Sequence, residues 1–123
     1  MRDDRPLVAV LDDDEFVCRA LCRLLSSLSF RPIAFSSGGQ LLAGLEKEVP
    51  RYALVDLHMP GMNGLEVLRE LRNRPANFAT IIITGSDSEG SEERCLEGGA
   101  AAYLRKPITA DVLSATFEAL SGR

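Results

Sequence analysis

Acidic, hydroxyl and amino side chains stand at the ends of four separate apolar runs of the sequence. They are Asp12 and Asp13 after residues 7–11, Asp56 after residues 52–55, Thr84 after residues 79–83 and Lys106 just beyond residues 101–104. If the runs are strands of one parallel sheet, these side chains meet at one edge, where open α/β sheets bind their ligands. Three carboxylates there would repel one another by several kcal/mol even at an effective dielectric constant of about 20. Mg²⁺, which prefers oxygen ligands, would relieve that repulsion.

This group of side chains is suited to phosphoryl transfer, because catalysis of that reaction consists mostly of positioning and charge neutralisation. Asp56 is the candidate nucleophile. Mg²⁺ and Lys106 would offset the charge on the phosphoryl oxygens, and Thr84 would donate a hydrogen bond to one of them. Taken alone, each acid has a simpler explanation, since acidic residues favour the first turn of a helix and Asp is common beside turns rich in Pro and Gly.

The elements that must position these residues alternate five times between strand and helix. Apolar and β-branched runs predict strands at residues 7–11, 31–35, 52–55, 79–83 and 101–104. Apolar residues at three- and four-residue spacing predict a helix after each strand, with first turns near Asp14, Ser37, Asn63, Ser88 and Thr109. The alternation predicts an α/β fold, a doubly wound parallel five-stranded sheet with helices on both faces and right-handed crossovers.

Local signals give these helices expected ends and inner faces. Capping boxes are expected at residues 37–40 and 63–66, and helix stops at Pro50 and Pro75. The expected inner faces are Leu41, Leu42 and Leu45; Leu65, Leu68 and Leu71; and Val112, Leu113, Thr116, Phe117 and Leu120. The fourth helix, at about residues 88–96, is poorly specified, because Gly90 interrupts it.

Length, charge and cysteine usage exclude several classes of protein. The 123 residues fit one domain, residues 1–123, and the net charge of −4 gives no basic footprint for nucleic acid. No apolar run reaches the roughly 18–20 residues that span a bilayer, and the charged N-terminus argues against secretion. Cys18, Cys22 and Cys95 lack a metal-binding spacing, which indicates reduced thiols in a cytoplasmic protein.

Four motifs, in order along the chain, resemble those of the receiver (CheY-like) domain of a two-component response regulator. They are Val-Leu-Asp-Asp-Asp at 10–14, Val-Asp-Leu-His-Met-Pro-Gly-Met-Asn-Gly at 55–64, Ile-Thr-Gly at 83–85 and Tyr-Leu-Arg-Lys-Pro at 103–107. The similarity runs from Leu7 to Leu120, and residues 15–25 with the Ile-Thr-Gly motif are most similar to FixJ-type receivers. The resemblance implies a flavodoxin-like (βα)5 fold with strand order 2-1-3-4-5.

The resemblance also implies roles for individual residues. They are Asp12, Asp13, Asp56 and the backbone carbonyl of His58 around Mg²⁺, Thr84 and Lys106 beside the phosphoryl group, and Thr84 with Tyr103 as a switch. Asp56 would accept a phosphoryl group from a sensor histidine kinase. The domain would be regulatory, not an enzyme, and would catalyse its own phosphorylation and dephosphorylation. Phosphorylation would repack the surface formed by the fourth helix, fifth strand and fifth helix. That surface would bind an output partner or domain, or a second copy in a homodimer. The domain itself would not contact nucleic acid or membrane directly.

Three positions near the site differ from the commonest pattern or add to it. Gly85 stands where Ala is frequent beside Thr84, and it keeps the space for a phosphoryl group. His58 and Ser86 lie two residues beyond Asp56 and Thr84, where side chains of this family face the phosphoryl group and could tune its lifetime. The His58 side chain is not expected to bind metal, because the other ligands are hard oxygens.

Two other functions fit parts of the pattern. Aspartyl-phosphate phosphatases of the haloacid dehalogenase type also use an Asp nucleophile and Mg²⁺, but they usually carry a second Asp where this chain has His58. A receiver-like interaction module without phosphorylation would need no acidic site. The presence of the full set of site residues argues against that module.

Overall fold

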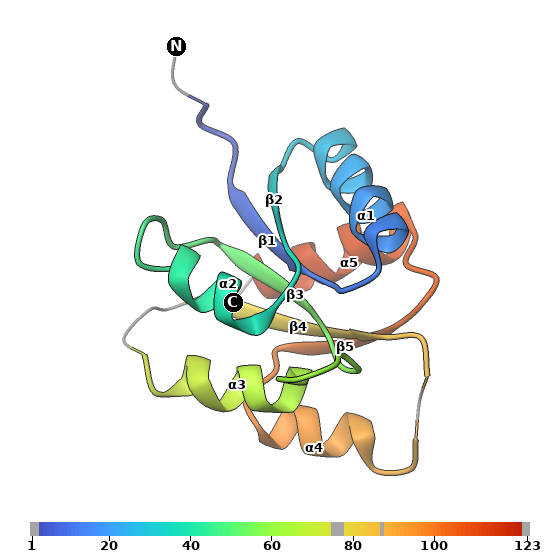
Figure 1. Ribbon diagram of the computed structural model, residues 1–123. Coiled ribbons are helices and arrows are strands. Elements are labelled where there is room, and N and C mark those ends of the chain that lie inside the picture. Colours follow the sequence, from blue (N-terminus) through green and yellow to red (C-terminus); the bar gives the residue numbers. More distant parts are fainter. Residues whose placement is uncertain (1–2, 75–77, 87, 122–123) are drawn as a thin grey trace.

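The computed structural model describes residues 3–74, 78–86 and 88–121, and it shows five strands that alternate with five helices. The elements are β1 (Leu7–Leu11), α1 (Glu15–Ser27), β2 (Arg31–Phe35), α2 (Gly38–Gly44), β3 (Tyr52–Asp56), α3 (Gly64–Arg72), β4 (Ala79–Thr84), α4 (Ser91–Glu97), β5 (Ala102–Arg105) and α5 (Ala110–Ser121). In Figure 1 the helices α1 and α5 lie on one face of the sheet, and α2, α3 and α4 lie on the other. Among the described residues no helix is both long and apolar enough to cross a membrane.

The sheet has the strand order β2-β1-β3-β4-β5, with every pair parallel. The predicted fold class and strand order are therefore confirmed. All residues of β1 and β3 are buried, because helices cover both faces of the sheet. This is why these strands are continuous apolar runs instead of alternating patterns. The parallel pairing brings the carboxyl ends of all five strands to one edge.

Two hydrophobic clusters, one on each side of the sheet, hold the strand ends in place. Under α2, α3 and α4, the cluster includes Leu11, Val55, Val67, Leu68, Ile82, Cys95 and Tyr103. Under α1 and α5, it includes Val10, Leu21, Leu25, Leu54, Ile83, Leu113 and Phe117. Successive residues of a strand point to opposite faces, so β1, β3, β4 and β5 each contribute to both clusters. A residue that follows a strand is thus fixed by packing on two sides.

Side-chain caps begin most of the helices, largely as the sequence predicts. Asn63 and Glu66 form the complete capping box at the start of α3, with both hydrogen bonds at 3.0 Å. The box predicted at residues 37–40 is only half formed. Ser37 Oγ accepts from the Gln40 N–H, but the Gln40 side chain accepts from the N–H and hydroxyl of Ser36. The Gln40 side chain therefore ties the preceding loop to α2.

The second and fourth helices are shorter than the sequence predicts. Helix α2 ends at Gly44, well before Pro50, so that proline does not stop it. Glycine is a poor helix former, and the chain continues in turns after it. Helix α4 begins after Gly90 instead of at Ser88. Gly90 has φ of 81°, a left-handed conformation that suits glycine and separates residues 88–89 from the helix.

Two helix faces also differ in detail from the predicted ones. On α3, Val67 is fully buried beside Leu68 and Leu71, whereas Leu65 is only partly buried. On α5, Val112 is 40% exposed and does not face inward as predicted. Short helices leave the orientation of a face open by one residue, and packing against the sheet decides it. The predicted stop at Pro75 lies outside the described residues.

Candidate functional site

The three predicted acids meet at the carboxyl edge of the sheet. One carboxylate oxygen from each of Asp12, Asp13 and Asp56 lies within 4.8 Å of the other two. Asp12 and Asp56 are only 2% and 4% exposed, while Asp13 is exposed. Both buried acids directly follow, or end, a fully buried central strand. The site is therefore a buried pair of acids with one open side.

Lys106 reaches this group from the loop after β5. Its Nζ lies 2.9 Å from Asp12 Oδ2 and 3.6 Å from Asp56 Oδ1. The Lys106 N–H donates to the carbonyl of Thr84 at 2.7 Å, which continues the pairing of β4 and β5 beyond the strand. The peptide bond between Lys106 and Pro107 is cis. A single ammonium group thus faces both buried carboxylates.

The side-chain charges of the site do not balance, since three carboxylates lie together with one ammonium group. Burial raises the pKa of Asp56 to about 6, and the Asp12 carboxylate adds to the rise while the Lys106 ammonium opposes it. Burial disfavours the charged form of Lys106, but its pairing with Asp12 and Asp56 outweighs this and raises the pKa of that amine. The one ammonium contacts Asp12 and Asp56, and Asp13 adds a third carboxylate, so the site still favours a further cation.

The carboxylate of Asp12 provides a direct test of whether a metal fits. Its Oδ2 is buried and lies 2.9 Å from the Lys106 ammonium. Its Oδ1 accepts from the N–H of Asp14 at 2.9 Å, which fixes the orientation of the carboxylate. A buried oxygen of this kind, close to two other carboxylate oxygens, matches the hard ligands of Mg²⁺. The residues therefore fit the predicted metal.

Thr84 ends β4, as predicted, and it is buried. Its hydroxyl donates to the Ser86 carbonyl at 2.6 Å, and it accepts from the Ser86 N–H at 3.2 Å. His58 Nε2 lies 2.8 Å from the same carbonyl of Ser86. The loops after β3 and β4 are therefore joined by hydrogen bonds beside the acids.

Gly64 allows α3 to begin close to the end of β3. A Cβ atom at this position would lie 2.8 Å from the backbone oxygen of Asp56 and 2.8 Å from the Cα of Leu57. The Gly64 N–H donates to the Leu57 carbonyl at 3.0 Å, and Leu57 in turn donates to the Ile83 carbonyl at 2.8 Å. This close packing fixes the backbone of Asp56 between β4 and the first turn of α3.

Tyr103, the predicted switch residue, is 8% exposed and packs in the cluster under α3 and α4. The guanidinium carbon of Arg105 lies 5.3 Å from the centre of its ring, at the range of a cation–π contact. Arg105 also pairs with Glu92 of α4 at 3.1 Å. The Tyr103 side chain therefore lies in its inward position in this structure, and Arg105 connects it to α4.

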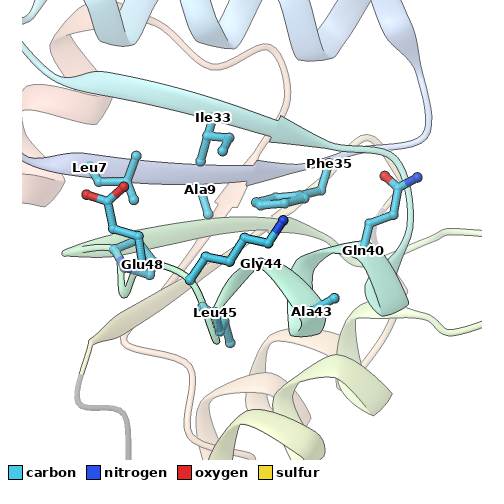
Figure 2. Close-up of a pocket in the computed structure, with 11 residues that line it drawn as sticks. Leu7, Ala9, Ile33, Phe35, Gln40, Ala43, Gly44, Leu45 and Glu48 are labelled. Atoms are coloured by element: carbon cyan, nitrogen blue, oxygen red, sulfur yellow. The ribbon is translucent and has the colours of Figure 1, made fainter.

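Two cavities have different relations to the site. One, of about 570 Å³, lies between β1, β2 and α2, where Leu7, Ile33, Phe35 and Leu45 give it a mainly apolar lining (Figure 2). Asp12, Asp13 and Asp56 are not among the residues that line it. The other, of about 510 Å³, is bordered by Asp12, Asp13 and the first turns of α1. The acidic edge therefore opens toward solvent beside α1.

The fold and the acidic edge together define a flavodoxin-like α/β domain with a carboxylate site at its strand ends. Residues 8–118 match the family described as the response regulator receiver domain. The transcriptional regulator NtrC of Salmonella typhimurium is 32% identical over 114 residues, which are 93% of this chain and 24% of that protein. The sensory/regulatory protein RpfC of Xanthomonas campestris is 34% identical over 98% of this chain and 17% of its own length.

Solved structures agree with the sequence comparison. A response regulator receiver protein from Burkholderia phymatum has 38% identity and a TM-score of 0.84, with 96% of each chain covered. A CheY-like receiver from Methanospirillum hungatei has 27% identity and a TM-score of 0.87 over 97% of this chain. The chain belongs to the response regulator receiver domain family. It is a regulatory phosphoacceptor domain of two-component signalling, and it spans about a quarter of the length of the NtrC relative.

The sequence correctly placed Asp12, Asp13, Asp56, Thr84 and Lys106 at one edge of the sheet. It did not reveal some of the residues that hold these side chains and their loops in position. It predicted no partner for the imidazole of His58, which binds the Ser86 carbonyl. It also gave Gly64 and Arg105 no role. Of these, only the glycine left a signal, since it follows the capping residue at the start of a helix. The particular similarity to FixJ-type receivers stays a prediction.

Proposed function

We propose that Asp56 is the phosphoacceptor and that a sensor histidine kinase supplies the phosphoryl group. The observation that carries this is the meeting of three carboxylates with Lys106 at one edge of the sheet. Asp56 is central to the group, because it ends β3 between the loops of β1 and β4. Its pKa of about 6 leaves it mostly ionised at neutral pH, and the ionised form is the nucleophile.

Asp12, Asp13 and Asp56, with the backbone carbonyl of His58, would hold Mg²⁺. The bound ion would neutralise charge on the phosphoryl oxygens. Lys106 would approach the same oxygens from the opposite loop, because its ammonium already lies 3.6 Å from Asp56. The Thr84 hydroxyl would donate to one of them once Asp56 carries the group. Positioning and charge compensation by these residues would let the domain catalyse its own phosphorylation and dephosphorylation.

The switch would pass from Thr84 to Tyr103 and to the face formed by α4, β5 and α5. Helix α4 suits this role, since it is short and starts without a side-chain cap. Tyr103 would exchange between its present buried position and an outward one. The ion pair of Arg105 with Glu92 links β5 to α4 and would move with it.

That face would bind an output partner or domain, or a second copy of the chain on phosphorylation. The NtrC relative is a DNA-binding transcriptional regulator, so a transcriptional output is one candidate. We propose that the receiver unit spans residues 1–123, without direct contact to nucleic acid or membrane. We place it in the cytoplasm, because its cysteines are free thiols.

Intact mass spectrometry after incubation with acetyl phosphate and Mg²⁺ tests the proposal. The wild-type protein should gain one phosphoryl group, and Asp56→Asn should gain none. Chelation of Mg²⁺ should abolish the gain. The assignment of Asp56 is wrong if the asparagine variant is phosphorylated as well as wild type. Steady hydrolysis of a phosphomonoester by the wild-type chain would instead favour a phosphatase.

A further inference from the structure

The backbone carbonyl of Ser86 accepts hydrogen bonds from two separate segments, the end of β4 and the loop after β3. Thr84 Oγ1 donates to it at 2.6 Å from within the same turn, and His58 Nε2 lies 2.8 Å from it across the site. A carbonyl oxygen has two lone pairs, so both contacts can be satisfied together. The Ser86 N–H also donates to Thr84 Oγ1 at 3.2 Å. The turn after β4 is therefore closed on itself and tied to the loop after β3.

This arrangement occupies the only proton that the Thr84 hydroxyl can donate. A threonine hydroxyl has one donor, which here points to the Ser86 carbonyl. It cannot at the same time donate to a phosphoryl oxygen on Asp56. A change of Thr84 from one acceptor to the other must therefore break the bond to Ser86.

We propose that His58 is a positioning residue that holds the turn after β4 in this closed arrangement. By fixing the Ser86 carbonyl beside Thr84, the imidazole favours the state in which the threonine hydroxyl is occupied. Removal of the imidazole donor then shifts the equilibrium toward the state in which Thr84 is available to the phosphoryl group. The inference rests on the proposed role of Asp56 and adds a residue that sets the threshold of the switch.

Two substitutions separate the donor of His58 from its bulk. His58→Gln places an amide N–H where Nε2 stands, and His58→Met fills similar space without a donor. Beryllofluoride serves as the probe of the phosphorylated state. It is titrated into the protein at saturating Mg²⁺, and the NMR chemical shifts of the amides around Thr84 report its binding. Loss of one such hydrogen bond should make His58→Met bind beryllofluoride about two- to tenfold more tightly than wild type. His58→Gln should recover most of the wild-type value.

A second pair of variants tests whether the effect passes through Thr84. In a Thr84→Val background the hydroxyl is gone, and His58→Met should no longer tighten binding. In the free protein, the Ser86 N–H should exchange faster with water in His58→Met than in wild type or His58→Gln. Equal beryllofluoride affinity in wild type and His58→Met, or an equal effect in the valine background, would overturn the inference alone. Failure of the wild-type protein to bind beryllofluoride would overturn the proposed function.

Discussion

Replacement of Asp56 by asparagine should stabilise the metal-free protein. The carboxylate is almost completely buried, and its pKa is raised from 3.8 to about 6 by burial and by Asp12, against the attraction of Lys106. The folded state therefore binds a proton more readily than the unfolded state does. Above the folded pKa, the ionised group costs stability in proportion to the shift, about 3 kcal/mol. Asparagine resembles the protonated acid in shape and carries no charge.

The sign of the pH dependence follows from the same shift. Between pH values near 4 and 6, the folded protein holds a proton on Asp56 that the unfolded chain has lost, so the contribution of this group to stability falls as the pH rises. The free energy of unfolding of Asp56→Asn should exceed that of wild type by about 3 kcal/mol at about pH 7.5 and by about 1 kcal/mol near pH 4.5.

Urea unfolding followed by far-UV circular dichroism in EDTA measures both values. The difference between the two proteins is the relevant quantity, because it cancels the titration of groups that do not interact with Asp56. Mg²⁺ should stabilise wild type by about 2.7 kcal/mol at a hundredfold excess over its dissociation constant, and should stabilise the variant less. A variant that is no more stable than wild type at about pH 7.5, or whose advantage does not change with pH, would refute the electrostatic reasoning.

Three further substitutions test the supports of the site. Lys106→Met leaves Asp12 and Asp56 without their shared cation. It should destabilise the metal-free protein by about 2–3 kcal/mol, which is less than the loss expected for a fully buried pair. Urea unfolding should show that Mg²⁺ restores part of the lost stability. Gly64→Ala places a Cβ 2.8 Å from the Asp56 carbonyl oxygen. It should cost about 1–3 kcal/mol in the same assay and reduce the rate of phosphorylation by acetyl phosphate. Asn63→Ala removes the capping box and should cost about 1 kcal/mol, with no change in the rate of phosphorylation.

The strands and the composition of the site could be predicted because they depend on local sequence and on one rule of topology. β1 is apolar throughout, and β3 and β4 are mostly apolar up to Asp56 and Thr84, because burial on both faces requires that pattern. Once the strands are parallel, Asp12, Asp56 and Thr84 must share an edge, whatever the details of the helices. The capping box of α3 was likewise predictable, since its two residues, Asn63 and Glu66, lie three positions apart in the sequence.

Features that depend on long-range packing or on backbone oxygens could not be predicted. The start of α4 is set by the left-handed conformation of Gly90, whereas glycine in a sequence indicates only a weak helix. Helix α2 ends at Gly44, where a Cβ atom would lie 2.6 Å from the ring of Phe35 in β2. The bond of His58 to the Ser86 carbonyl depends on two loop conformations at once. No pattern of side-chain types indicates which backbone oxygen a histidine will contact.

The acidic site is retained at a cost in stability that the two hydrophobic clusters offset. Asp56 follows four apolar residues whose side chains alternate between those clusters, so it cannot withdraw from Asp12 without displacing β3. The repulsion therefore persists in the folded protein, where it raises the affinity for any cation that reaches the three oxygens. Lys106 offsets part of it and is only partly buried, so its ammonium group can shift toward a new anion. A rigid sheet that holds like charges together would thus make the domain responsive to a bound cation and to a phosphoryl group.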